Sequence, residues 1–422
     1  MNKDSGSTGA FCEKKKQNNN MNGLGRNCMN KRQSIISITI LVILISCNLR
    51  APITGAGSLI SIISDDFLLS SGAAGMLTTL PLLAFAAVSP IVGSFSGKIG
   101  AGKLFIISIA VLITGIIIRS TLGEWGLFLG TLLLGMAIAV GNVMLPAVIK
   151  SKFPDRIEAM TSLYTVILQI VAAVATAVGV PLSAVFGWRA ALGIWVITAA
   201  AALVVCIVNR DMSIRDISSR PAELDGRPAD RDLYSAPMTW WITFYMGVQS
   251  MMFYSFVAWL SPMLQSRGYG DEAAGYMLTV YVIMGMAGSA ALSFIMKRNK
   301  SQSTTGVMLG SLYLLGMICM LLSPYLTGLL LPGIIVCGFC SGTCISFSMA
   351  LFGLHTSDGE SASRLSGLAQ SVGYLVAAVG PVVLGKIFDI TQSWNIPLII
   401  LTAAAVFLIA AGSVVGRDEI IQ

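Results

Sequence analysis

The sequence is a succession of apolar runs of about 20 residues that are separated by short polar breaks. A run of that length crosses the hydrocarbon layer as one helix, so the chain is expected to fold as an all-α polytopic membrane protein. Barrel strands would instead alternate over about 10 residues, which does not fit these runs. Composition agrees, because 55% of residues are hydrophobic and 11% charged, against about 25% charged in soluble domains.

We expect twelve transmembrane helices, six on each side of a hydrophilic connector at residues 210–236. The connector is rich in Pro, Asp and Arg, which is typical of a flexible linker. Residues 1–33 are polar and predict a disordered tail, which leaves six-helix bundles at 34–209 and 237–416. The expected spans are 34–63, 73–95, 103–120, 125–149, 158–184, 190–209, 237–264, 273–297, 304–323, 327–352, 362–386 and 394–415.

Lysine and arginine sort to one side of the membrane under this layout. The tail, the connector and alternate loops hold 22 of the 27, whereas four, Arg119, Arg189, Arg267 and Lys386, fall on the other side. By the positive-inside rule, both termini and the connector are cytoplasmic. The net charge of +7 therefore reflects basic loops and does not indicate nucleic-acid binding.

The remaining basic residue, Arg50, lies about 16 residues into the first span, which is about 24 Å along a helix and near the bilayer centre. An arginine there is costly and marks a function by default. It shares a helical stripe with small and polar residues, including Ser46, Thr54, Gly57 and Ser61. We expect this stripe to line a polar cavity and Arg50 to be the sole positive charge near the middle of the membrane. The alternative is an arginine that bonds backbone carbonyls or ties two helices together.

Other polar side chains inside the spans are few, and we expect them to supply neutral donors and acceptors beside Arg50. The alternatives are interhelical hydrogen bonds for the amides and packing for the aromatic residues. Asn48 lies about 200° round the helix from Arg50, so both cannot point squarely into one cavity. The predicted substrate-binding residues are Arg50, Asn48, Thr54, Asn142, Tyr164, Gln169, Gln249, Tyr254, Gln370 and Tyr374.

No Asp or Glu is central to any expected span, although proton-driven carriers commonly use an intramembrane acid. His355, the single histidine, is expected to be a loop residue at the inner end of the tenth span, with proton coupling as its alternative role. Coupling stays open between facilitated diffusion and symport in which the substrate carries the proton.

Short segments recur in order at offsets of about 200 residues. Ala73 to Thr78 matches a segment from Ala273, Gly126 to Leu129 matches one from Gly328, and VAAV at 171–174 recurs at 376–379. These matches predict two parallel six-helix pseudo-repeats, the architecture of the major facilitator superfamily, with substrate held between the halves.

Three stretches carry a closer resemblance: NLRAPITGAGSLI, GSFSGKIGAGK and above all GNVMLPAVIKSKFPDRIEAMTSLYT at 141–165. With them, the chain resembles the cyanate/nitroimidazole transporter branch (CynX/NimT) of that superfamily over about residues 34–416. The resemblance implies a bacterial inner-membrane carrier that moves a small anionic or polar heterocyclic solute by alternating access. Gly97, Ala101 and Gly102 stand where the superfamily usually has an Asp and further basic residues, which puts the charge-relay role of that loop in doubt.

Enzyme and pump functions lack support in the sequence. There is no HExxH, Gly-x-Ser-x-Gly or P-loop motif, and one histidine cannot build a triad or zinc site. Cys337, Cys340 and Cys344 share a helix face, which we interpret as packing rather than a metal site. We expect a monomer without cofactor whose partners are the solute, the lipid bilayer and, as a candidate coupling ion, protons. The alternative function is multidrug-type efflux, for which a buried acid is expected.

Overall fold

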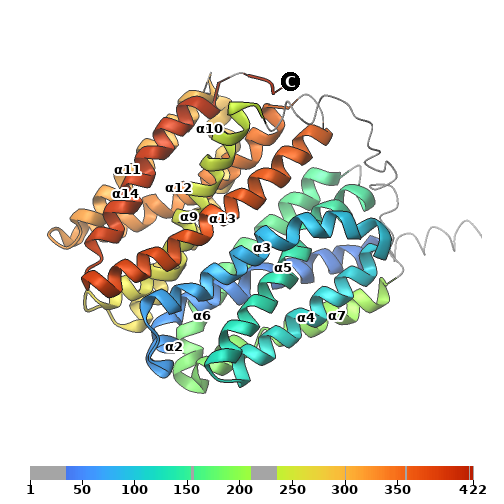
Figure 1. The fold of residues 1–422 in the computed structure, drawn as a ribbon, viewed down its shortest axis with the longest axis horizontal. Helices are drawn as coiled ribbons and strands as arrows, with labels where there is room; N and C mark the ends of the chain where they lie inside the picture. The colour runs from blue at the N-terminus through green and yellow to red at the C-terminus, as the bar shows by residue number, and fades with distance from the viewer. Residues whose placement is uncertain are drawn as a thin grey trace, which may run out of the picture.

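The computed structural model describes residues 35–153, 156–210, 235–299, 301–356, 359–417 and 419–421, so the predicted tail and most of the predicted connector lie outside the described residues. Helices form two groups, which Figure 1 shows as a blue-to-green half and a yellow-to-red half. The first half contains the first span (Ile35–Ser58), α2 (Ile60–Phe67), α3 (Ser71–Ile99), α4 (Ala101–Thr121), α5 (Glu124–Lys152), α6 (Ile157–Gly193) and α7 (Val196–Val208). The second half contains α9 (Pro237–Gln265), α10 (Asp271–Arg298), α11 (Gln302–Leu322), α12 (Leu330–Leu354), α13 (Gly359–Thr391) and α14 (Asn395–Val415).

The expected twelve spans in two six-helix halves are observed. Ten segments of the described chain are long and apolar enough to cross a membrane, and one of these, Leu163–Val208, covers most of α6 and all of α7. The twelfth span is α9, whose 29 residues are long enough to cross but include Trp, Tyr, Ser, Thr and Gln side chains. One bound differs from expectation, because the first span breaks at Leu59 (φ −106°, ψ 2°) before α2. The element α6 is broken at Gly187 (φ 79°), which lies between the expected fifth and sixth spans at 158–184 and 190–209.

The polar composition of α9 follows from its central position. It packs against α13, α14, α10 and α12 of its own half and against α2 and α3 of the other half. Protein rather than lipid therefore surrounds most of α9, and many of its side chains are buried, including Gln249 and Tyr254. Polar groups inside a membrane are tolerated where they face protein or a water-filled cavity, so a helix that departs from lipid-like hydropathy marks the interior of the molecule.

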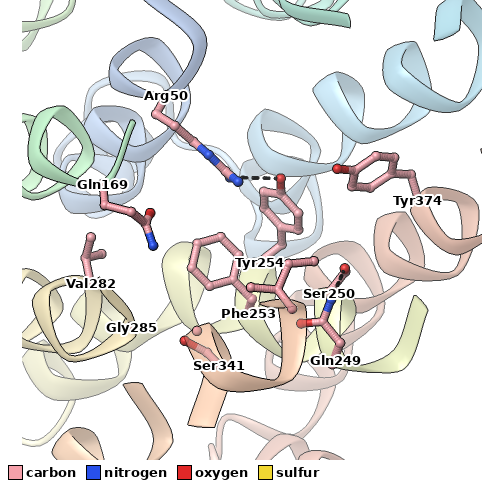
Figure 2. Close-up of a pocket in the computed structure, with 12 residues that line it drawn as sticks. Arg50, Gln169, Gln249, Ser250, Phe253, Tyr254, Val282, Gly285, Ser341 and Tyr374 are labelled. Carbon is pink, nitrogen blue, oxygen red and sulfur yellow. Dashed lines mark hydrogen bonds between the residues drawn. The ribbon is translucent and has the colours of Figure 1, made fainter. Parts of the chain in front are cut away.

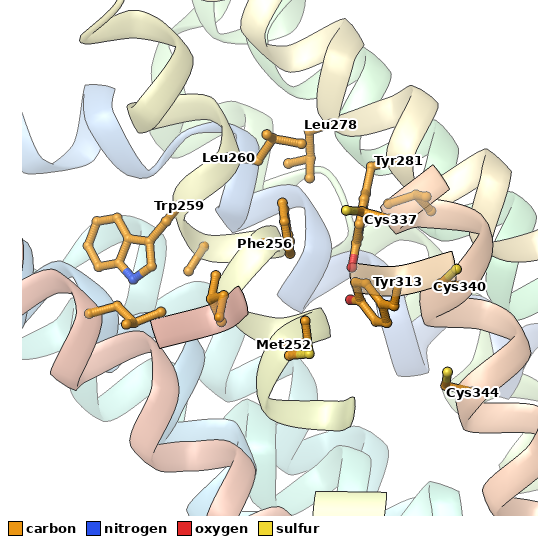
Figure 3. Packing of buried hydrophobic residues seen from close by; sticks show 14 of the residues in the cluster. Met252, Phe256, Trp259, Leu260, Leu278, Tyr281, Tyr313, Cys337, Cys340 and Cys344 are labelled. Carbon is orange, nitrogen blue, oxygen red and sulfur yellow. The ribbon is translucent and has the colours of Figure 1, made fainter. Parts of the chain in front are cut away.

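The core of the second half combines apolar side chains with tyrosines and cysteines (Figure 3). Tyr281 and Tyr313 are fully buried, and Figure 3 shows their hydroxyl ends turned toward one another. The three cysteines on one face of α12, Cys337, Cys340 and Cys344, are also fully buried in this cluster. They therefore lie where packing would use them, surrounded by side chains of α9, α10 and α11.

The two halves meet tightly at the end of the molecule that carries α2, here called the α2 end. Between α3 and α13, the backbone amides of Ser71 and Gly72 each donate to the Asp389 carboxylate at 2.8 Å. A Cβ added at Gly75 would lie 2.6 Å from the carbonyl oxygen of Pro381. Only glycine permits so close an approach of two helices, so this contact is specified by sequence.

A second contact between the halves joins α6 and α10. The Thr279 hydroxyl donates to the Thr176 hydroxyl at 3.1 Å, and Val180 packs where a Cβ on Gly275 would lie, at 3.1 Å. Each of these residues lies nearer the α2 end of its helix. The described hydrogen bonds between the halves thus concentrate toward that end.

His355 is not a simple loop residue, because it is 2% exposed and lies just beyond the end of α12. Its Nδ1 lies 2.6 Å from the carbonyl oxygen of Glu419, and its Nε2 lies 2.7 Å from that of Val415. The backbone amide of Ile421 donates to the His355 carbonyl at 2.8 Å. The histidine thus fastens the C-terminal segment to the end of α12, away from the space between the halves.

Gly342 provides a stability test of the close α10–α12 crossing. A Cβ there would lie 1.7 Å from the Gly285 carbonyl oxygen, so Gly342→Ala should destabilise the protein by about 1–3 kcal/mol through overpacking. Gly353→Ala on the same helix is the matched control, because nothing lies within 4 Å of its added Cβ and Ala favours helix over Gly. Thermal unfolding of the purified proteins should show a lower Tm for Gly342→Ala alone. Equal Tm values would contradict this crossing.

Candidate substrate-binding site

A cavity lies between the two halves, with about 480 Å³ of empty space that includes open solvent. Arg50 and Gln169 approach it from the first half, and side chains of α9, α10, α12 and α13 approach it from the second half (Figure 2). Arg50 is the only charged residue among the described residues that line it. The lining residues are Arg50, Gln169, Gln249, Ser250, Phe253, Tyr254, Val282, Gly285, Ser341, Gly342, Ile345 and Tyr374.

Arg50 extends across the cavity toward α9. Its Nη1 donates a hydrogen bond to the Tyr254 hydroxyl at 3.2 Å, and its guanidinium carbon lies 5.7 Å from the centroid of the Phe253 ring. A cation within about 6 Å of an aromatic face is attracted by the ring quadrupole. Tyr164 and Tyr374 are also near enough to interact with the charge. Every one of these partners is uncharged, so the guanidinium keeps its full net charge at the cavity.

Contrary to the sequence prediction, the polar stripe on the first span does not line the cavity along its length. Only Arg50 of that stripe lines the cavity. Gly57 instead packs against α9, where a Cβ would lie 2.3 Å from the Val257 carbonyl oxygen, and Ser61 donates to the side-chain oxygen of Gln265. Its small residues therefore serve mainly to bring the first span against α9 of the other half.

The ten predicted residues divide evenly by position. Arg50, Gln169, Gln249, Tyr254 and Tyr374 line the cavity, whereas Asn48, Thr54, Asn142, Tyr164 and Gln370 do not. Three of the latter have local partners that account for their polarity. Asn48 donates to the Leu44 carbonyl and accepts from Thr198, Thr54 donates to the Arg50 carbonyl, and Gln370 donates to Ser366. Tyr164 lies near the Arg50 charge, and Asn142 is half-buried in α5.

Gln249 is the cavity amide with an unmet hydrogen-bonding capacity. Its Nε2 donates to the Ser250 hydroxyl at 2.7 Å, while its Oε1 is buried without a partner in the described structure. A buried amide oxygen that lacks a donor is unfavourable by about 1–3 kcal/mol. A solute that brings an N–H or O–H group to this side of the cavity would relieve that cost.

Sequence reasoning missed the residues that shape the cavity without charge. Phe253, Val282 and Ile345 give it apolar walls, and Gly285 with Gly342 lets α10 and α12 cross at its edge. Apolar side chains inside spans carry no signal of their own. The Gly338-xxx-Gly342 spacing was readable in the sequence, but such spacings are common at any membrane helix contact.

Arg119 is a second buried cation, in the last turn of α4. It is 2% exposed and buried in the first half, although sequence analysis counted it only among the residues on the outer side. Cα–Cβ bonds tilt toward the N-terminus of a helix, so a long side chain in the last turn of α4 folds back into the bundle. Its Nη1 donates to the Pro52 carbonyl at 2.7 Å, while Nε and Nη2 have no partner in the described structure.

Comparison of the sequence with known families and proteins gives consistent matches. The profile of the Major Facilitator Superfamily matches residues 39–381. An uncharacterized transporter of Bacillus subtilis, YycB, is 37% identical and covers 90% of this chain and 93% of its own. The 2-nitroimidazole transporter of Escherichia coli is 31% identical over 90% and 95%. The cyanate transport protein CynX of Escherichia coli is 23% identical over 84% and 91%.

Solved structures resemble the fold in the same way. The crystal structure of a mutant of the nucleoside transporter NupG superimposes with a TM-score of 0.75, over 91% of this chain and all of that one, at 15% sequence identity. Identity at that level supports the fold alone. The chain therefore shares its overall fold with that structure.

Arg119 offers a test that separates the two buried arginines. Replacing a buried ionic group with an apolar side chain of similar volume is often neutral or stabilising by about 1–4 kcal/mol, so Arg119→Met should leave the Tm unchanged or raise it. Thermal unfolding measures this, and binding of a transported solute should persist. A large fall in Tm would mean that the hydrogen bond to Pro52 outweighs the desolvation of the guanidinium.

Proposed function

Because this chain belongs to the Major Facilitator Superfamily, we propose that it carries a small anionic or polar heterocyclic solute across the membrane by alternating access of its two halves. The relatives named above are transporters rather than enzymes, and the chain is a multi-pass membrane transporter of the same kind. The single observation that carries the substrate class is Arg50, a cation at the cavity between the halves with only neutral partners.

The chemistry of the lining supports an anion or an electron-rich ring. The guanidinium can bind two acceptor atoms at once, and Phe253 offers an aromatic face beside it. The unpartnered Gln249 oxygen favours a donor group on the same solute. Relatives named for 2-nitroimidazole and for cyanate are consistent with such solutes, and these two compounds are the first to test.

Efflux of organic cations is the weaker proposal. A carrier of cationic drugs is expected to present a carboxylate to its substrate, and no Asp or Glu is among the described residues that line the cavity. Arg50 would instead repel a cation. Purified protein in liposomes, tested with small anions and nitroimidazoles against cationic dyes, distinguishes the two proposals.

The residues that line the cavity also bear on how solute transport is coupled to protons. Since the described lining offers neither a carboxylate nor a histidine, we propose facilitated diffusion or symport in which a protonated solute brings the proton. His355 is an unsuitable relay, because both of its ring nitrogens face backbone carbonyls at the far end of α12. Solute uptake that does not respond to a proton gradient would favour facilitated diffusion.

We further propose a monomer in a bacterial inner membrane, with both termini in the cytoplasm. The sorting of lysine and arginine supports this orientation, and it puts the α2 end outside. Because the described contacts between the halves concentrate toward the α2 end, this conformation would then be closed to the outside.

Arg50→Ala should abolish uptake of cyanate and 2-nitroimidazole into liposomes while leaving the Tm nearly unchanged. Arg50→Lys keeps the charge but loses the planar two-pronged geometry, so it should transport poorly. Arg119→Met is the matched control, since it removes the other buried guanidinium and should retain uptake. If Arg50→Ala misfolds while any folded remainder still binds the solute, Arg50 is structural and the site assignment fails.

Single cysteines in a cysteine-free background test the orientation. Glu272 in the first turn of α10 and Arg417 beyond α14 are both exposed. A membrane-impermeant thiol reagent should label Glu272→Cys on intact cells and Arg417→Cys only after permeabilisation. Labelling of Arg417→Cys on intact cells would reject cytoplasmic termini.

A further inference from the structure

The bond between Arg50 and Tyr254 is a hydrogen bond that links the two halves at the cavity itself, because both residues line it. Arg50 lies 17 residues before the end of α2 at Phe67 and Tyr254 lies 11 residues before the end of α9 at Gln265. The links at Ser61 and Asp389 lie closer to the α2 end, and hydroxyls of Thr279 and Thr79 make further described links, to Thr176 and to the Ala378 carbonyl. No partner in those links lines the cavity, whereas Figure 2 shows the Arg50–Tyr254 bond among the lining residues.

This bond is weak for an arginine. Its Nη1–Oη distance is 3.2 Å, whereas hydrogen bonds between an arginine and a charged acceptor are about 2.7–2.9 Å long and roughly twice as strong as neutral ones. Even with a neutral acceptor, the Pro52 carbonyl, Arg119 makes a shorter bond of 2.7 Å. A phenol hydroxyl is a neutral acceptor that binds one terminal nitrogen of the guanidinium without neutralising its charge.

An anion in the cavity would compete with Tyr254 for the same terminal nitrogen of Arg50. Its oxygens or nitrogens would bind the terminal edge of the guanidinium in pairs, and that edge is the part of Arg50 that Figure 2 shows pointing at Tyr254. Phe253, the neighbouring residue on α9, stabilises the charge through its ring and needs no hydroxyl to do so. Tyr254 is thus the group that an anion must replace.

We propose that Tyr254 is a positioning residue that holds Arg50 in the empty carrier and is displaced by the anionic solute, so that solute binding itself releases a link between the halves. This proposal rests on the function proposed above and adds how occupancy of the site is transmitted to the halves. A ligand can shift a conformational equilibrium only through contacts that differ between the two states. Exchanging a bond across the halves for a bond to the solute is such a difference.

The first arm of the test needs no solute. Val180 is 4% exposed and packs against α10 of the other half, so a cysteine there reports opening of the α2 end. In a cysteine-free Val180→Cys protein, Tyr254→Phe should raise the rate of thiol labelling at least about twofold, the effect of losing one hydrogen bond. Tyr374→Phe is the matched control, because it removes a hydroxyl from the same cavity that has no hydrogen bond to Arg50 in the structure. An unchanged labelling rate in Tyr254→Phe, or an equal rise in both variants, would overturn the proposal that the Arg50–Tyr254 bond is a tether between the two halves.

The second arm uses cyanate as the probe anion. Cyanate should raise Val180→Cys labelling when Tyr254 is present, should do so less in Tyr254→Phe and should have no effect in Arg50→Ala. Because the anion no longer competes with a hydroxyl, Tyr254→Phe should also bind cyanate about two- to tenfold more tightly. Weaker binding would make Tyr254 an ordinary solute contact, and unchanged binding would make it a bystander; either result overturns displacement.

The two arms separate this inference from the proposed function. If Tyr254→Phe loosens the α2 end but cyanate is not transported, the tether stands and the substrate assignment fails. If cyanate is transported with Arg50 as its site and Tyr254→Phe changes neither labelling nor affinity, the function stands and the tether fails. The Tm of Tyr254→Phe excludes a merely structural role, which would lower stability without tightening binding.

Discussion

An unneutralised guanidinium at the boundary between two helix bundles is the constraint from which the rest of this molecule follows. Arg50 has no carboxylate partner among the described lining residues, and a bare cation in hydrocarbon is strongly unfavourable. The protein reduces that cost with a phenol hydroxyl, an aromatic face and a cavity that can admit water. The hydroxyl and the ring come from α9, a span with polar side chains that packs against helices of both halves.

Close backbone approach is the second requirement, because Arg50 reaches Tyr254 only if the first span lies directly against α9. Gly57 allows this contact, and Gly75 and Gly275 repeat it between the other paired helices. Each of these contacts lies on the α2 side of the cavity. In each contact, a glycine of one half packs against backbone or a β-branched side chain of the other half. Such a contact involves few hydrogen bonds, so its separation would leave few buried polar groups unpaired.

The sequence predicted spans well because run length and loop charge constrain them directly; for α9 it predicted 237–264 and the structure has Pro237–Gln265. It did not predict the break at Leu59 inside the first span, since that break depends on local backbone angles, whereas the break at Gly187 lies in the expected gap between the fifth and sixth spans. Site residues were harder still. Gln249 and Gln370 look alike in sequence, yet Gln370 donates to Ser366 one turn away whereas the Gln249 oxygen is unpartnered at the cavity. Which amide finds a local partner depends on how the helices rotate against each other.

The two buried arginines show why composition alone could not locate the site. Both lie within spans, and both lack an acidic partner among the described residues. Arg119 donates to a backbone carbonyl inside one half and does not line the cavity. Arg50 donates to a hydroxyl of the opposite half at the edge of the cavity, so under the proposed function its hydrogen bond can pass from a protein partner to a solute. The two buried arginines thus differ in where the partner lies, within one half for Arg119 and across the halves for Arg50.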